Sequence, residues 1–209
     1  MKLLLIILSV LCFSEDDFKL QNGDLIFQED CTQITDNTIK EVTSSIEGYN
    51  FTHVGIVYID ETEDVFVLEA TRPKVVLTPI NEYLYPEGAA CYPRSVVGRL
   101  EEGYQHLIPK AFDEGMKLID KEYDDGFILG NDKYYCSELI YDILLKANNG
   151  IPVFPLNIMT FKSPDTGEIT EEWKSYFEKY GLPIPEGEPG VNPGAMSRSS
   201  VIKIIYNYL

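Results

Sequence analysis

The chain of 209 residues is 44% apolar and 12% aromatic, which is enough to bury the core of one domain. Lys and Arg number 17 against 34 Asp and Glu, a formal net charge of −17 at pH 7. A surface with this excess of negative charge repels a phosphate backbone, so we expect no nucleic-acid partner and no docking on anionic lipid through a basic face. A small peptide, amide or lipid-like substrate remains open.

The chain begins with the pattern of an export signal. Residues 3–13 form an uncharged run that follows a lysine and ends at Ser14 and three acidic residues. The run is too short to span a bilayer but is typical of a signal peptide over residues 1–14, which leaves residues 15–209 as a single mature domain. Two processing sites are open, cleavage after Ser14 and lipidation of Cys12 as in a bacterial lipoprotein. We expect an exported protein, periplasmic or extracellular, without a transmembrane segment and with a lipid anchor only if Cys12 is used.

Export would bring the remaining cysteines into an oxidising compartment, where paired cysteines become disulfides. Without Cys12, the chain keeps Cys31, Cys91 and Cys136. Either Cys31 pairs with Cys91 and one thiol stays free, or all three thiols stay free. In both cases an unpaired thiol is left over, and a free cysteine in an exported protein calls for an explanation.

The first half of the chain has mainly strand patterns. Residues 23–27 indicate a turn into a short strand, and residues 38–46 place apolar side chains at helical spacing. Two apolar runs, 51–59 and 64–70, flank an acidic turn and predict a β-hairpin. Further short strands are expected over residues 75–77 and 89–92.

The second half has mainly helical patterns. Pro109 fits the first turn of a helix that runs towards Tyr123, with an inward face of Ala111, Phe112, Met116 and Ile119. A second helix opens at Cys136 and ends near Asn149, with an apolar stripe of Leu139, Ile140, Ile143, Leu144 and Ala147. A third helix is expected over residues 171–180, with Trp173, Phe177 and Tyr180 inward.

The end of the chain combines a loop and a strand. Eight of the fourteen residues from Gly181 to Gly194 are Gly or Pro, so we expect a surface loop without regular structure there. The apolar run over residues 201–206 predicts a closing strand.

The predicted hairpin brings a histidine and a carboxylate together. With a loop of Asp60-Glu61-Thr62, His53 lies directly opposite Glu69 on the same face, whereas a slip of one residue separates them. A carboxylate beside an imidazole fixes its tautomer and stabilises the imidazolium. The pair is therefore a candidate general base with its orienting acid.

Cys136 is the candidate nucleophile. A cysteine in the first turn of a helix lies at the positive end of the helix dipole, and a neighbouring imidazolium further favours its thiolate. The unpaired N–H groups of the same turn, including that of Cys136, are candidate oxyanion donors. The rings of Tyr134 and Tyr135 are candidates for a further donor or a lid.

Each of these residues also has a structural interpretation. A single histidine on a strand, a half-buried glutamate and a small buried cysteine are all common without any catalytic role. His106 lies in a polar stretch before Pro109 and is a weak catalytic candidate. The two histidines and scattered cysteines do not have the spacing of zinc ligands, so we expect neither a metal nor another cofactor.

Four motifs in order strengthen the catalytic interpretation. They are Gly23-Asp24-Leu25-Ile26-Phe27, Thr52-His53-Val54-Gly55-Ile56-Val57, Val67-Leu68-Glu69-Ala70 and Tyr134-Tyr135-Cys136-Ser137-Glu138-Leu139-Ile140. Together they resemble the YiiX-like branch of the NlpC-type cysteine hydrolases. The resemblance implies an α+β, circularly permuted papain-like fold, with an antiparallel sheet or small barrel packed against helices and the nucleophile at a helix N-terminus. It implies Cys136 as nucleophile, His53 as base, Glu69 as orienting acid and Tyr135 as a residue that lines the site.

These observations predict an exported cysteine hydrolase that cleaves an amide or ester bond through a Cys136 thioester. The acidic composition favours a neutral or cationic substrate, such as a cell-wall-type peptide or a small amide. An acyltransferase acting on lipid-like substrates and a binding module for a peptide or fatty acid without turnover are the alternatives, because a fold alone does not fix function.

Overall fold

The computed structural model describes residues 18–29, 31, 46 and 48–208. The predicted signal segment 1–14, with Cys12, lies outside the described residues, as does all but the last residue of the predicted helix 38–46. Among the described residues, no helix is long and apolar enough to cross a membrane.

An antiparallel sheet of six strands forms the centre of the fold, in the order β4-β3-β2-β1-β5-β8. Its strands are β1 (Leu25–Glu29), β2 (His53–Ile59), β3 (Val65–Ala70), β4 (Val75–Pro79), β5 (Arg94–Leu100) and β8 (Ile202–Tyr208). The last strand returns to pair with β5, so the predicted closing strand is confirmed. Antiparallel strands with helices packed on the sheet make this an α+β fold, as predicted.

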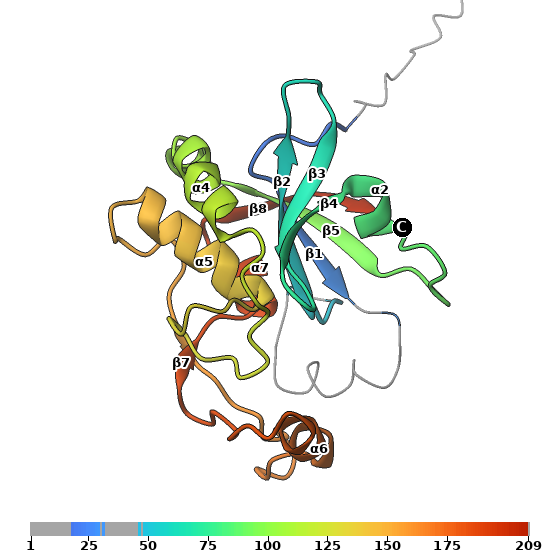
Figure 1. The fold of residues 1–209 in the computed structure, drawn as a ribbon, viewed down its shortest axis with the longest axis vertical. Coiled ribbons are helices and arrows are strands. Elements are labelled where there is room, and N and C mark those ends of the chain that lie inside the picture. The colour runs from blue at the N-terminus through green and yellow to red at the C-terminus, as the bar shows by residue number, and fades with distance from the viewer. Residues whose placement is uncertain (1–17, 30, 32–45, 47, 209) are drawn as a thin grey trace, which may run out of the picture.

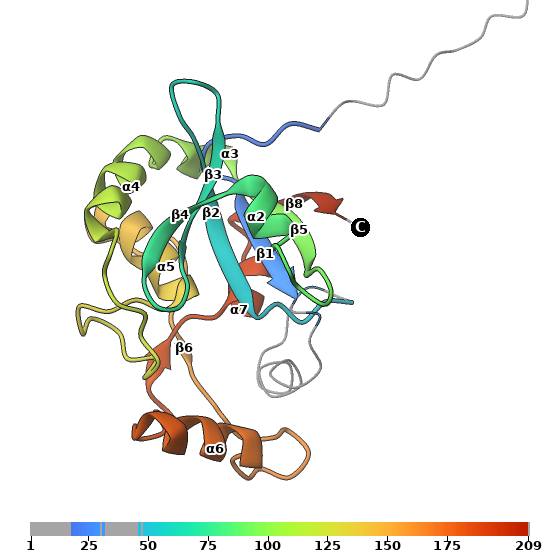
Figure 2. The ribbon, with the colours of Figure 1, turned by 45° about the vertical axis from the view of Figure 1, so that its right-hand side comes forward.

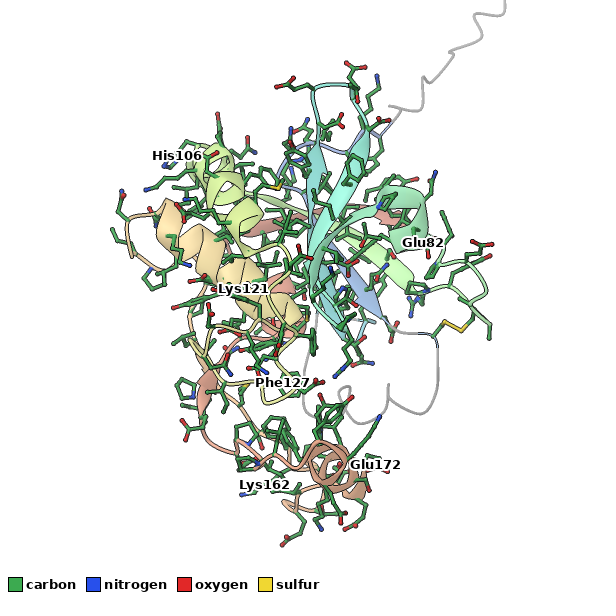
Figure 3. The ribbon with its side chains drawn as sticks, in the orientation of Figure 1. Glu82, His106, Lys121, Phe127, Lys162 and Glu172 are labelled. Carbon is green, nitrogen blue, oxygen red and sulfur yellow. A yellow bond between two sulfur atoms is a disulfide. The ribbon has the colours of Figure 1, made fainter. Side chains whose placement is uncertain are left out.

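The predicted strand over residues 89–92 is wrong. These residues form an irregular segment, and the next strand begins at Arg94. Pro93 has no N–H to offer a sheet, and Cys91 is tied by a disulfide to Cys31, with 6.0 Å between the two Cα atoms. This bond, the yellow link in Figure 3, settles the pairing that the sequence left open and leaves Cys136 as the free cysteine of the described residues.

The hairpin of β2 and β3 is present, but its register differs from the predicted one by two residues. Ile56 pairs with Leu68 and Ile59 with Val65, so the connection is five residues long and not three. The Asp60 carboxylate explains the longer turn, because its Oδ1 accepts from the backbone N–H groups of Thr62 and Asp64. A shift of two residues keeps every side chain on its face of the sheet, so His53 and Glu69 still share a face as predicted.

Helices cover the two faces of the sheet unequally. Figure 1 shows α4 (Ile108–Gly115) and α5 (Cys136–Ala147) on one side and the short α2 (Ile80–Leu84) on the other. The larger apolar cluster, on the α5 face, includes Val54, Ile56, Leu68 and the predicted stripe of α5. The smaller cluster, on the α2 face, consists of Ile26, Val57, Val67, Tyr83, Leu84 and Val97.

The helix expected from Pro109 towards Tyr123 is shorter than predicted. After the one-turn α3 (Glu102–Gln105), α4 is followed by the 3₁₀ turn η1 (Met116–Leu118). Asp120 then has a left-handed φ of 71°, and the N–H of Val75 takes the carbonyl of Lys121 as its acceptor. The backbone therefore leaves the helix to run beside β4, because bonds to the sheet edge replace further helical ones.

Residues 157–190 form an appendage below the sheet and α5, as Figure 2 shows. It contains β6 (Asn157–Ile158), α6 (Glu171–Tyr180) and β7 (Pro189–Gly190), and α6 matches the predicted third helix. The expectation of no regular structure in the Gly/Pro-rich stretch is wrong in part, because this stretch contains β7 and the start of α7 (Pro193–Ser197). There the Asn192 side chain caps the helix and Pro193 occupies its first turn, so Pro favours helix initiation.

Candidate active site

His53 and Glu69 are joined by a short contact on the α2 face of the sheet. Nε2 of His53 lies 2.6 Å from Oε2 of Glu69. The Glu69 side chain is 8% exposed and that of His53 is 23% exposed. The two residues are diagonal neighbours in the observed register and not directly opposite, yet both side chains reach across because they share a face.

Cys136 is the first residue of α5 and is buried. Its Sγ lies 4.0 Å from the carbonyl oxygen of Thr52, the residue before β2. The thiol also interacts with the ring of His53, because Cys136 is one of the groups that raise the pKa of that imidazole. Because Glu69 engages Nε2 of that ring, Nδ1 is the nitrogen that is left for Cys136. The three predicted residues are therefore connected in the order Cys136, His53, Glu69.

The cysteine and the histidine come from different faces of the sheet. Cys136 belongs to the apolar cluster under α5, whereas His53 packs beside Tyr83 of α2. They meet where β2 begins, since the first turn of α5 lies against that end of the strand. A histidine at any later position of β2 would lie farther along the strand from the helix N-terminus.

The surroundings of His53 favour its charged form. Burial alone lowers the pKa of an imidazole, but the hydrogen bonds to Cys136 and Glu69 and the charges of these groups outweigh it and raise the pKa of His53 to about 10. The ring is therefore an imidazolium at neutral pH. The charged form of His53 stabilises the folded state fully below pH 6.5, the ordinary pKa of histidine. This contribution is lost as pH rises through about 10, the pKa of His53 in the folded state.

Tyr83 packs beside the imidazole. Its ring centroid lies 5.8 Å from that of His53, and its hydroxyl donates to the carbonyl of Ile26 at 2.9 Å. Burial and the charges of Glu69 and Cys136 raise the pKa of Tyr83 well above its ordinary value, so the phenol stays neutral. Gly55 leaves room for this ring, because a Cβ there would lie 3.3 Å from it and 2.3 Å from a methyl of Val67.

The two tyrosines before the nucleophile have different partners. The Tyr134 hydroxyl donates to Oδ2 of Asp142 in α5 at 3.2 Å, so that donor is already used. The Tyr135 hydroxyl accepts the N–H of Val191 at 3.2 Å and keeps its own proton for donation. Ser137, on the other side of Cys136, donates to the carbonyl of the same Val191 at 3.0 Å. The chain that leaves the appendage is thus fastened on both sides of the nucleophile.

A buried carboxyl lies in the first turn of the same helix. Glu138 is 2% exposed, its Oε1 accepts the N–H of Gly130 at 2.9 Å, and its Oε2 has no partner among the described residues. Burial is the main cause that raises the pKa of Glu138 to about 8, and the charges of Asp124 and Asp142 add to it. The side chain is therefore mainly protonated at neutral pH and holds the loop before α5 as a neutral group.

His106 does not join the other candidates. It lies exposed between α3 and α4, and Figure 3 shows it at the α4 end of the molecule. The described part of the chain also contains no group of three or more His, Cys, Asp or Glu side chains that could hold a metal ion.

Sequence reasoning missed three residues around the site, namely Thr78, Tyr83 and Glu138. Thr78 donates its hydroxyl to Oε1 of Glu69 at 2.5 Å. Thr78 could have been found by predicting the register between β3 and β4. Thr78 pairs with Val67, which lies on the same face of β3 as Glu69. Tyr83 had no such signal, because the contact depends on how α2 folds back over the sheet.

Comparison with known proteins shows the family of this chain. The sequence profile of the permuted papain-like amidase family C92, which includes YaeF and YiiX, matches residues 19–206. The chain is 26% identical over 177 residues to the uncharacterized protein YiiX of Escherichia coli strain K12, covering 84% of this chain and 81% of the relative. It is also similar to the crystal structure of YiiX from Escherichia coli O157:H7, with a TM-score of 0.71 and 24% identity over 91% of this chain and 99% of the other.

That crystal structure is described as a metalloprotein. The described residues of this chain do not fit such a group, since they contain no cluster of ligands for an ion. The family profile spans the strands, the cysteine helix and the appendage, and the structural similarity extends over nearly all of the relative. This chain therefore belongs to the permuted papain-like amidase family of YaeF and YiiX.

Proposed function

We propose that this protein is a cysteine amidase in which Cys136 attacks the substrate carbonyl, His53 transfers protons and Glu69 orients His53. The observation that carries the proposal is the connected set itself. A free cysteine at the start of a twelve-residue helix lies against Thr52, the residue before His53, and raises the pKa of that imidazole. A buried carboxylate holds the same imidazole at 2.6 Å. Membership of an amidase family supports the amide as substrate class.

In the first half of the reaction, the Cys136 thiolate forms a bond to the carbonyl carbon, and the carbonyl oxygen takes up the negative charge. N–H groups of the first turn of α5 are unpaired within the helix and stabilise this oxyanion. The His53 imidazolium then gives its proton to the amide nitrogen, the carbon–nitrogen bond breaks, and the amine leaves. The products of this half are a Cys136 thioester and a neutral His53.

In the second half, His53 accepts a proton from water as the water oxygen attacks the thioester carbonyl. The carbon–sulfur bond breaks, the acid leaves, and the thiolate–imidazolium pair is restored. Glu69 keeps the ring nitrogen Nδ1 directed at the sulfur. We further propose that Tyr135 supplies a second hydrogen-bond donor, because its hydroxyl accepts from Val191 and keeps its proton.

We infer the substrate class from the net charge of the protein and from the export that we propose for it. With a formal net charge of −17, the protein disfavours anionic substrates, so neutral or cationic peptides and other small amides are preferred. The proposed signal segment places the reaction outside the cytoplasm.

Turnover of an amide panel by the purified protein and by Cys136→Ala tests the proposal. We expect the variant to lose activity by about 10³-fold or more, because no other described cysteine is free. An intact mass spectrum after mixing with an activated ester should show an acyl adduct on the parent protein only. Undiminished turnover by Cys136→Ala would overturn the proposal.

A further inference from the structure

Both oxygens of the Glu69 carboxylate are held, and only one of them by His53. Oε2 contacts the imidazole at 2.6 Å, and Oε1 accepts the hydroxyl of Thr78 at 2.5 Å. We propose that Thr78 is a positioning residue that fixes the Glu69 carboxylate and, through it, the ring of His53. The inference rests on the proposed function, because it assigns Thr78 a part in the same reaction.

The sheet gives Thr78 this position. Thr78 pairs with Val67 and Glu69 pairs with Val76, so Thr78 and Glu69 are diagonal neighbours on one face of adjacent strands. His53 reaches Glu69 from the other side, from β2. The carboxylate therefore lies between two partners on two different strands and cannot rotate without losing one of them.

A hydroxyl is the donor that suits this position. Glu69 is 6% exposed, so an oxygen without a protein partner would be left with little water to replace it. A neutral donor satisfies Oε1 without adding a positive charge that would compete with the imidazolium for the carboxylate. Hydrogen bonds to a charged acceptor are also stronger and more directional than those between neutral groups.

One short segment contacts both His53 and Glu69. Thr78 is the fourth residue of β4, and α2 follows directly at Ile80. The ring of Tyr83 in α2 packs beside His53, whereas the hydroxyl of Thr78 holds Glu69. β4 and α2 therefore both help to keep the imidazole directed at the sulfur.

The test compares Thr78→Val, which keeps the shape and removes the hydroxyl, with Thr78→Ser, which restores the hydroxyl. We expect Thr78→Val to lower kcat about tenfold with KM unchanged, and to slow the alkylation of Cys136 by iodoacetamide at pH 6 by a similar factor. Thr78→Ser should stay within about twofold of the parent in both measurements. Thr160→Val is the matched control, because Thr160 donates to a carboxylate of the appendage, Glu186, at 3.1 Å.

Equal rates for Thr78→Val and the parent would overturn the inference, as would a loss that Thr78→Ser does not restore. If Thr78→Val unfolds at the assay temperature, Thr78→Ala replaces it, with the same expectations. The alkylation rate needs no substrate, so it separates the two proposals. A parent protein whose Cys136 reacts no faster than free cysteine argues against the proposed function itself, whereas a fast parent and an equally fast Thr78→Val argue against Thr78 alone.

A double-mutant cycle with Glu69→Gln shows whether Thr78 acts through Glu69. We expect Thr78→Val to have almost no further effect on alkylation in the Glu69→Gln background, because the charged acceptor is already gone. Additive losses would mean that Thr78 acts by another route, and the positioning role would be rejected.

Discussion

The beginning of β2 and the appendage are each stabilised by a different kind of contact. At the beginning of β2, Thr78, Glu69 and His53 are linked by two polar contacts of 2.5 and 2.6 Å between largely buried groups. In the appendage, the rings of Phe161, Trp173 and Phe177 pack against one another with centroids 4.9 to 5.8 Å apart. Polar contacts of this kind depend on direction, whereas packed rings tolerate small shifts.

The two regions meet at a few residues. Phe127, labelled in Figure 3 between the main body and the appendage, packs on Tyr135 on one side and on Trp173 on the other. Phe127 has a left-handed φ of 53°, which is strained for an aromatic residue and requires support from its surroundings. Arg72 adds a second link, because it donates to Asp125 at 2.7 Å and to the Tyr176 hydroxyl at 2.6 Å. The difference between the regions predicts that the chemistry is sensitive at β2 and that the appendage affects mainly stability.

The largest effect is expected at His53. Replacement of His53 by Gln should lower turnover about 10³-fold, because it removes the group that transfers protons. Alkylation of Cys136 at pH 6 should fall about 10²-fold, since a thiol without an imidazolium partner is mostly protonated there. His106→Gln is the matched control and should behave as the parent. An unchanged alkylation rate in His53→Gln would show that His53 does not affect the reactivity of the Cys136 thiol.

Trp173→Ala tests the aromatic side of the comparison. Removing a buried indole should cost about 3 kcal/mol of local stability, because the cavity lies among rings that cannot collapse fully. Hydrogen exchange should accelerate over residues 171–180 and stay slow in the sheet, while the alkylation rate of Cys136 changes less than about twofold. Tyr92→Ala, at a largely exposed ring, is the control. A tenfold slower alkylation in Trp173→Ala would show that the two regions are coupled.

Glu138 makes the stability of the folded state depend on pH. The folded state keeps its proton up to about pH 8, whereas the unfolded chain releases it near pH 4.5, so the folded state binds more protons in this window. Stability therefore falls as pH rises through the window. Urea unfolding between pH 5 and 9 should show a weaker decline for Glu138→Gln. Glu172→Gln makes the same substitution at an exposed residue of α6 and should keep the decline of the parent. A Glu138→Gln curve that also keeps the decline would contradict this account.

The smallest effect is expected at Arg72. Its guanidinium lies 4.4 Å from the ring of Tyr123 and is about half exposed, so the ion pair with Asp125 and the ring contact are screened by water. Arg72→Met should lower the unfolding free energy by about 1 kcal/mol, and Lys174→Met, at an exposed pair within α6, by less. A loss of several kcal/mol in Arg72→Met would mean that this link, and not the aromatic rings, holds the appendage.

Much of this fold follows from local patterns. The strands at Leu25, His53, Val65 and Val75 and the helices at Cys136 and Glu171 were all predicted, because alternation and helical spacing are properties of neighbouring residues. The face shared by His53 and Glu69 was predicted too, although the register was wrong by two residues, since the network around Asp60 lengthens the turn. The errors at residues 89–92 and after Leu118 have a common cause, because a disulfide and a sheet edge act on those segments from outside.

The sequence by itself determined the family, the strands and helices that have a clear local pattern, and the residue types available for chemistry, because motifs and spacing are fixed along the chain. Only the tertiary structure decided that Cys136 and His53, which lie on different faces of the sheet, meet at the beginning of β2. It also decided that Thr78 holds the second oxygen of Glu69 and that Val191 is fastened to both neighbours of the nucleophile. These contacts join residues between 9 and 84 positions apart. Their geometry depends on strand register and on the packing of α5 and α2 against the sheet, which no local pattern specifies.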